Sequence, residues 1–71
     1  MYYVIEIQTS ENQGAVIPFT FTDLNHAYSK YHALLSVAAV SNVPKHGAML
    51  FNDESFVIAN YVFNHESEQA N

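Results

Sequence analysis

The sequence predicts an α+β protein with the element order β-β-α-β-β, a four-stranded antiparallel sheet with one helix packed on one of its faces. Three observations support this prediction. Segments rich in β-branched and aromatic residues occur twice before and twice after a long central segment. In that central segment, apolar residues recur at spacings of three and four, which is typical of an amphipathic helix. Short polar clusters separate the paired segments, so each pair is expected to form a hairpin.

The first strand is predicted at residues 2–9. Because side chains alternate across a strand, its residues divide into two sets on opposite faces. The set that we expect to meet the helix is Tyr3, Ile5 and Ile7, and the set expected on the other face is Tyr2, Val4, Glu6 and Gln8.

A polar loop at 10–14 is predicted to lead into a second strand at about 15–21. Gly14 can adopt the positive φ that closes such a loop. Pro18 has no backbone N–H to donate to a neighbouring strand, which predicts that this strand lies at an edge of the sheet.

The helix is predicted from residue 24 to about residue 41. Thr22 or Asp23 can cap its beginning, because either side chain can accept a hydrogen bond from a free N–H of the first turn. Asn42 is expected at the end of the helix in left-handed geometry, and Pro44 prevents continuation.

The third strand is predicted at 46–51 and the fourth at 56–65, with Asn52 and Asp53 taking the positive φ of the connecting turn. Both alternating sets of the fourth strand are apolar, so the pattern leaves open which set meets the helix. It also leaves the strand order open.

These elements form a single predicted domain over residues 1–64, followed by a polar, acidic tail at 65–71 that is predicted to be disordered. The predicted core combines the apolar stripe of the helix with one face of each strand. Its members are Tyr3, Ile5, Ile7, Ile17, Phe19, Phe21, Leu24, Ala27, Tyr31, Leu34, Leu35, Ala38, Leu50 and Ile58.

The sheet carries more apolar surface than one helix can cover. An antiparallel sheet with a solvated face should alternate apolar and polar residues, and the fourth strand does not. A large apolar patch usually marks an interface, which favours a homo-oligomer, and a two-fold dimer first. The alternative is that small apolar residues and tyrosines lie at an ordinary surface. The predicted interface residues are Tyr2, Val4, Val57, Ala59, Tyr61 and Phe63.

Composition excludes several classes of partner. The chain of 71 residues has a formal net charge of −5, two lysines, no arginine and no cysteine. Nucleic acids and anionic membranes attract clustered basic residues, so we expect neither as a partner. Disulfides and the usual structural zinc sites require cysteine, so the sequence also predicts neither of these. No apolar run is long enough to span a membrane and no basic leader is present, so a soluble, cytoplasmic protein is predicted.

Residues with catalytic or metal-binding chemistry do not form a recognisable pattern. The chain has no Gly-x-Ser-x-Gly turn and no glycine-rich phosphate loop. The histidines, which are His26, His32, His46 and His65, have no spacing that brings them to one metal. The sequence therefore predicts a protein that is not an enzyme, with no cofactor, no metal and no catalytic residue.

Glu6 and the tyrosines allow two interpretations each. Glu6 lies in mid-strand, where it would be a general base in a cleft or, as we favour, a residue at the rim of an interface or paired with Lys30, Lys45 or a tyrosine. The tyrosines would line a small-molecule pocket or, as is more common, pack in the core and the interface.

Four segments resemble a small uncharacterised protein family encoded in phages and prophages of gut Firmicutes. They are the opening Met-Tyr-Tyr-Val-Ile-Glu-Ile-Gln-Thr, the helical Ala-Tyr-Ser-Lys-Tyr-His-Ala-Leu-Leu-Ser-Val-Ala-Ala-Val-Ser, the link Val-Pro-Lys-His and the late Phe-Asn-His-Glu. The resemblance covers nearly the whole chain. It implies a phage-related gene and transfers no activity, cofactor or site residue.

We therefore expect a non-enzymatic, phage-related accessory or structural protein that acts through self-association or protein binding, in the cytoplasm or associated with a virion. The alternative is a small acidic inhibitor or modulator of a host protein, which recognises a basic patch through its carboxylates. A small oligomeric α+β enzyme with a pocket that the sequence does not identify is the third hypothesis.

Overall fold

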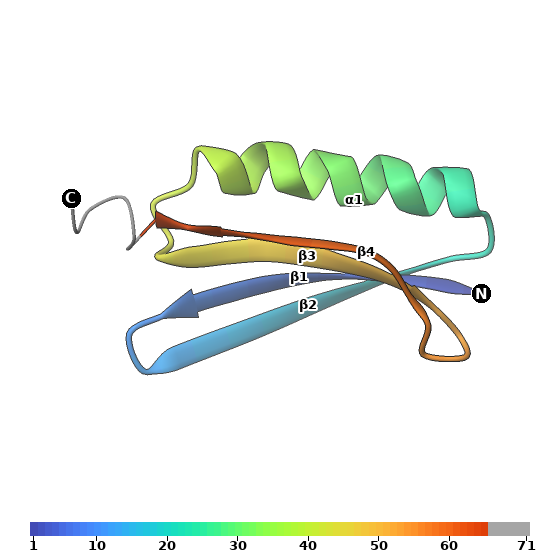
Figure 1. The fold of residues 1–71 in the computed structure, drawn as a ribbon, viewed down its shortest axis with the longest axis horizontal. Coiled ribbons are helices and arrows are strands. Elements are labelled where there is room, and N and C mark those ends of the chain that lie inside the picture. Colours follow the sequence, from blue (N-terminus) through green and yellow to red (C-terminus); the bar gives the residue numbers. More distant parts are fainter. Residues whose placement is uncertain (66–71) are drawn as a thin grey trace.

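In the computed structural model, which describes residues 1–65, four antiparallel strands form one sheet and a single helix lies along one of its faces (Figure 1). The elements in chain order are β1 (Tyr2–Ser10), β2 (Gln13–Phe21), α1 (Leu24–Ala39), β3 (Lys45–Asn52) and β4 (Val57–Asn64). The predicted fold class and element order are confirmed. His65 donates its backbone N–H to the carbonyl of Pro44 at 2.7 Å, and the rest of the predicted tail lies outside the described residues.

The strand order is β2-β1-β3-β4, so each hairpin contributes one central and one edge strand. Within residues 1–65, β2 is an edge strand, as Pro18 predicts. The first hairpin closes at the pair Ser10–Gln13, and hydrogen-bonded pairs recur at every second residue from there. Pro18, opposite Ile5, falls at a non-hydrogen-bonded pair, so its ring nitrogen points to the free edge and no ladder bond is lost.

The helix packs on the other face of β1 from the one that the sequence predicts. Val4 and Leu50 are fully buried beneath α1, whereas Tyr3, Ile5 and Ile7 lie on the opposite face, so their place in the predicted core is wrong. The length of the first loop explains the error. The expected five-residue loop would pair residues of equal parity, but the two-residue loop pairs Val4 with Phe19, which brings even residues of β1 beside the phenylalanines of β2.

The apolar stripe of the helix is as predicted. Ala27, Tyr31, Leu34 and Ala38 are the buried residues of α1, and Asp23 caps it by accepting a hydrogen bond from the backbone N–H of His26 at 3.0 Å. The helix ends at Ala39, two residues before the predicted end. Asn42 does not adopt left-handed geometry, because the N–H groups of Val40 and Ser41 already bond to the carbonyls of Val37 and Ala38 in a tighter last turn.

Both turns place their positive φ values at other residues than predicted. Among the described residues, Glu11 (φ 50°) and Ser55 (φ 65°) have positive φ, and Gly14 does not. Asn52 contributes through its side chain, since its Oδ1 accepts hydrogen bonds from the N–H groups of Glu54 at 2.9 Å and Phe56 at 3.0 Å. Such a side-chain mimic of a backbone turn removes the need for a positive φ at Asn52 itself.

A shift in register marks the β3–β4 ladder. Leu50 pairs with Ala59 and Phe51 with Val57, which leaves Ile58 as the extra residue of a β-bulge. Ile58 packs against the core cluster, as predicted, together with Leu50. Ile17 was also predicted in the core, but it is 40% exposed, because it lies on the edge strand that α1 contacts least.

Candidate functional site

The main surface feature is the face of the sheet that points away from α1, which we call the open face. It carries apolar side chains from all four strands. Its apolar residues are Tyr3, Ile5, Ile7, Val16, Pro18, Met49, Phe51, Val57 and Val62. No element within residues 1–65 covers this face, because the only described helix lies on the other one (Figure 1).

The register arranges these side chains in rows across the strands. Ile5 lies between Pro18 and Met49, and Ile7 lies between Val16 and Gly47. At one end of the face, the rings of Tyr3 and Phe51 stack with their centroids 5.4 Å apart. At the other end, the row consists of smaller or polar residues, namely Gly14, Thr9, Lys45 and Asn64. The open face is therefore bulky at its aromatic end, and at the opposite end it is thin on the side of β2 and β1, at Gly14 and Thr9.

Charge is nearly absent from the open face. Within the described strands, Lys45 is its one charged residue, since Glu6 faces the helix. Exposed carboxylates lie elsewhere, with Glu11 in the first hairpin, Asp53 and Glu54 in the second, and Asp23 at the start of the helix. A broad, uncharged apolar surface bounded by polar groups at its ends is the usual pattern of a protein-binding surface.

Gly47 sits in the middle of the open face, where β4 passes very close to β3. A Cβ atom on Gly47 would collide with the carbonyl oxygen of Tyr61 and would lie 2.7 Å from the Cα of Val62. Only glycine allows this approach. The β4 backbone and the side chain of Val62 fill the space that a side chain at position 47 would occupy.

Most of the predicted interface residues lie on the helix-facing side of the sheet. Val4 is fully buried there, and Tyr2 and Ala59 pack against the core cluster. Tyr61 and Phe63 share the face of Ala48 and His46, with their rings edge-to-face at 4.8 Å. Val57 alone of the six lies on the open face. The positions of Tyr2 and Val4 follow from the face of β1 that meets the helix, whereas those of Ala59, Tyr61 and Phe63 follow from the β3–β4 register.

A polar cluster lies on the helix-facing side of the sheet. Oε2 of Glu6 is 2.7 Å from Nε2 of His46, and the side-chain amide of Gln8 donates to the same oxygen at 3.1 Å. His46 is only 4% exposed, and its Nδ1 has no hydrogen-bond partner among the described residues. Glu6 was expected to pair with Lys30, Lys45 or a tyrosine. The β1–β3 register instead puts His46 opposite Gln8, one diagonal step from Glu6.

The other histidines and the tyrosines do not converge. His26 is exposed beside Asp23, with 2.9 Å between Nδ1 and Oδ2. In residues 1–65 no group of three or more His, Cys, Asp or Glu side chains is placed to hold a metal ion. Tyr31 is in the core, where burial and the neighbouring Tyr28 raise the pKa of its hydroxyl above the ordinary value. Tyr3 is on the opposite side of the sheet, so it shares no pocket with Tyr31.

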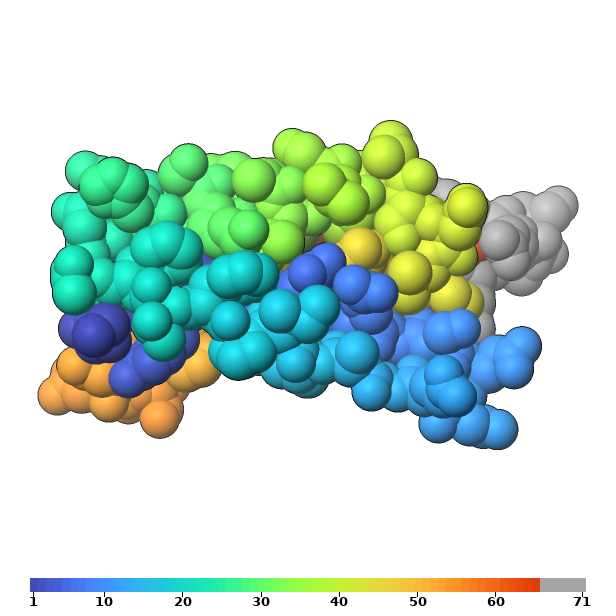
Figure 2. Space-filling model, turned by 180° about the vertical axis from the view of Figure 1, so that it is seen from behind, coloured from blue at the N-terminus to red at the C-terminus, as the bar shows by residue number. Residues whose placement is uncertain are grey.

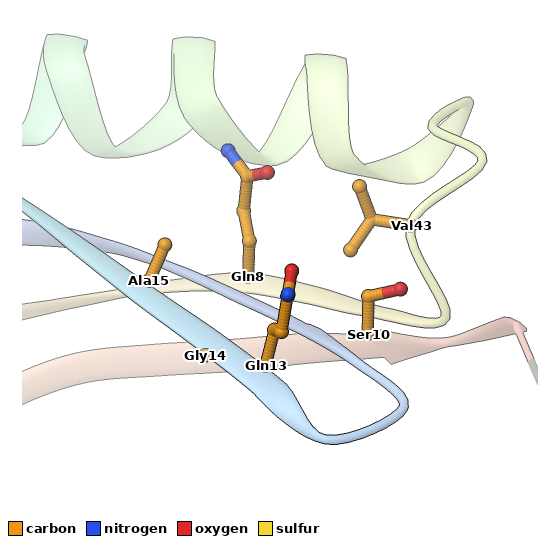
Figure 3. Close-up of a pocket in the computed structure, with 6 residues that line it drawn as sticks. All are labelled: Gln8, Ser10, Gln13, Gly14, Ala15 and Val43. Carbon is orange, nitrogen blue, oxygen red and sulfur yellow. The ribbon is translucent and has the colours of Figure 1, made fainter.

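A small pocket of about 180 Å³ lies between the first hairpin and the segment after α1 (Figure 3). Gln8 and Gln13 point into the space below Val43, from two neighbouring strands (Figure 3). Its lining consists of Gln8, Ser10, Gln13, Gly14, Ala15 and Val43. Pockets for drug-sized ligands hold about 300–1,000 Å³ and combine apolar walls with a few convergent polar groups. This one is smaller, and its lining contains no acid or base.

Comparisons with models of known protein families, with curated proteins and with solved structures found no match. The function must therefore be argued from the geometry of the chain itself. In the described part of the chain, no helix has the length and apolar character needed to cross a membrane.

Proposed function

We propose that the protein is a non-enzymatic, phage- or prophage-related accessory or structural protein that works by self-association through the open face of its sheet. The observation that supports this most directly is a set of three mainly apolar rows that cross the four strands without a covering element, with polar side chains only at Thr20 and Asn60 on the edge strands. Val16 and Val62 in these rows are 60% and 53% exposed. A monomer would leave this whole surface in water.

The size of the open face is sufficient for a specific contact. Strands of eight or nine residues, at about 3.3 Å per residue and about 4.8 Å between strands, give a face of roughly 500 Å². Two such faces together remove about 1,000 Å² from water, which is the lower bound for a biological interface.

The free energy of such a contact is modest. If half of that area is apolar, burial at about 25 cal/mol per Å² contributes about 12 kcal/mol. Loss of translational and rotational freedom costs about 4–15 kcal/mol. The two terms are similar, so we expect an association that depends on protein concentration in the accessible range.

Sedimentation equilibrium over a wide concentration range tests the proposal. The wild-type protein is expected to pass from monomer to dimer, and Val16→Lys on the open face is expected to abolish the dimer. Val37→Lys is the matched control, since Val37 is 57% exposed on the helix and its replacement changes the net charge equally. A wild-type protein that stays monomeric throughout, or equal effects of both substitutions, would overturn the proposal.

The exposed carboxylates favour a second candidate, an acidic modulator of a host protein. Glu11, Asp53 and Glu54 project from the two turns, where a basic surface can reach them. In that case binding to the partner should weaken as salt is added, whereas association through the open face should persist.

A further inference from the structure

We propose that the occupant of the open face is a second copy of this chain turned end for end, so that Lys45 of each copy meets the acidic turn at Asp53–Glu54 of the other. This inference rests on the proposed function and specifies its geometry. Two face-to-face sheets related by a two-fold axis can be aligned in two ways. The axis lies either across the strands, which exchanges the two ends of the face, or along the strands, which keeps like ends together.

The shape of the open face favours the end-for-end arrangement. Packed sheets keep a spacing of about 10 Å along their length. The stacked rings of Tyr3 and Phe51 thicken one end, whereas at the other end Gly14 and Thr9 leave the side of β2 and β1 thin and Lys45 is the one long side chain. Exchanging the ends puts the aromatic row of each copy over the thin row of its partner. The other arrangement sets aromatic rows against each other and leaves a gap where the thin rows meet.

The middle of the face fits the same arrangement. An axis that crosses the strands between the rows of Ile5 and Ile7 places Gly47 of one copy opposite Met49 of the other, because both residues are on β3. The unbranched, adaptable side chain of Met49 then packs over the backbone at Gly47, where no side chain projects. Ile5 and Ile7 face each other across the same axis, so the centre of the interface is aliphatic.

The charges at the two ends of β3 are complementary. The ammonium of Lys30 lies over the ring of Phe19 at 4.2 Å, but Lys45 has no ionic partner within residues 1–65. Asp53 is beside the N-terminal amine at 3.3 Å, whereas the carboxylate of Glu54 is unpaired in the same range. In Figure 1 the β3–β4 turn lies below the strands at its own end of the sheet, on the side away from α1, and the first hairpin lies on the same side at the other end. The β3–β4 turn therefore stands on the side from which a partner approaches, at the far end from Lys45.

The competing arrangement would use a different carboxylate. With the axis along the strands, Lys45 would approach the first hairpin of the partner, where Glu11 lies. The first hairpin and the β3–β4 turn are at opposite ends of the molecule, as Figure 2 shows for the light-blue segment at the right and the orange segment at the left. Glu11 and Glu54 therefore report on the two alignments separately.

A charge-exchange experiment distinguishes the end-for-end alignment from the alignment with the axis along the strands. Lys45→Glu and Glu54→Lys are each expected to weaken self-association about tenfold at low salt, since each introduces two like-charge contacts per dimer. An equimolar mixture of the two variants is expected to restore association to the wild-type level, because both contacts are then attractive. The control mixture of Lys45→Glu with Glu11→Lys carries the same net charges. In it the Glu11→Lys copies still pair with one another, but the heterodimer with Lys45→Glu should stay weak, because one of its two contacts sets the new carboxylate at position 45 against Glu54. Sedimentation velocity measures each dissociation constant.

The possible failures separate the two proposals. Rescue by Glu11→Lys and not by Glu54→Lys would overturn the end-for-end alignment in favour of the other axis. Dimers of equal strength in every variant would overturn it as well, while leaving self-association intact. A monomeric wild-type protein would overturn the proposed function and this inference together. Circular dichroism of each variant confirms that the fold is retained.

Discussion

Glu6 and His46 lie in contact beneath α1, 40 residues apart in the sequence, with 2.7 Å between Oε2 and Nε2. Their side chains are 12% and 5% exposed, so both are largely withdrawn from water. Burying a polar group without a hydrogen-bond partner costs free energy of folding. The two side chains are therefore tolerated in so small a core because each is a hydrogen-bond partner of the other.

The first prediction follows from this pairing. His46→Leu is expected to lower the free energy of unfolding by about 3–5 kcal/mol, because it leaves the buried carboxylate of Glu6 with Gln8 alone. The double variant Glu6→Leu/His46→Leu should regain most of that loss, since no unpaired group remains. Urea unfolding of Glu6→Leu, His46→Leu and the double variant measures the coupling energy between the two side chains. Additive effects would show that the pair does not act as a unit.

The close approach of β4 to Gly47 makes a second prediction. Gly47→Ala should lower the free energy of unfolding by about 3 kcal/mol or more, because the new methyl group meets the backbone of Tyr61 and Val62. Gly14→Ala is the control, since nothing lies within 4 Å of a Cβ there. At Gly14 the change should be neutral or stabilising by up to about 1 kcal/mol. Thermal unfolding of Gly47→Ala and Gly14→Ala tests this prediction, and equal melting temperatures of the two variants would contradict the close approach at Gly47.

Glu11 occupies the first position of a two-residue hairpin loop with a φ of 50°. Glycine adopts this conformation without the steric cost that a Cβ imposes. Glu11→Gly is therefore expected to raise the free energy of unfolding by about 0.5–1 kcal/mol. Asn12→Gly should lower it slightly, because Asn12 does not have a positive φ and gains only freedom in the unfolded chain. A destabilised Glu11→Gly would indicate a different loop geometry.

The phase of the helix can be tested with a pair of acidic substitutions. Leu34 is 8% exposed and Val37 is 57% exposed, one turn further along the same helix. Leu34→Asp should leave the protein unfolded, since a carboxylate without a partner would be buried in the core. Val37→Asp should remain folded. Proton NMR spectra of the two variants show the outcome, and a well-dispersed spectrum of Leu34→Asp would contradict the packing described here.

The parts of the fold that depend on local pattern were predictable, and those that depend on register were not. The apolar stripe of Ala27, Tyr31, Leu34 and Ala38 follows from helical spacing alone, and the edge position of β2 follows from Pro18. In β1 the even-numbered set includes Glu6 and Gln8, so alternation favours burial of the odd-numbered set, which lies away from the helix. The first loop decides this, and a change of loop length by an odd number of residues moves every side chain of the partner strand to the other face.

The same reasoning explains why the contact of Glu6 with His46 escaped sequence analysis. The two residues belong to β1 and β3, which are neighbours in the sheet but are separated in the sequence by β2 and the helix. Their contact depends on the register between these two distant strands. No turn chemistry or periodicity encodes that register. The open face was predicted to exist, because the last strand is apolar on both sides, but its residues had to come from the structure.

Pro18 also affects how large an assembly can become. Joining the free edge of β4 to the free edge of β2 in another molecule would repeat without limit and produce a growing fibril. The missing donor at Pro18 interrupts the β2 half of that junction. In a two-fold dimer, the open face of each copy covers the open face of the other, so neither open face is left to bind a third molecule. The imino ring therefore biases this small chain toward finite particles rather than amyloid-like growth.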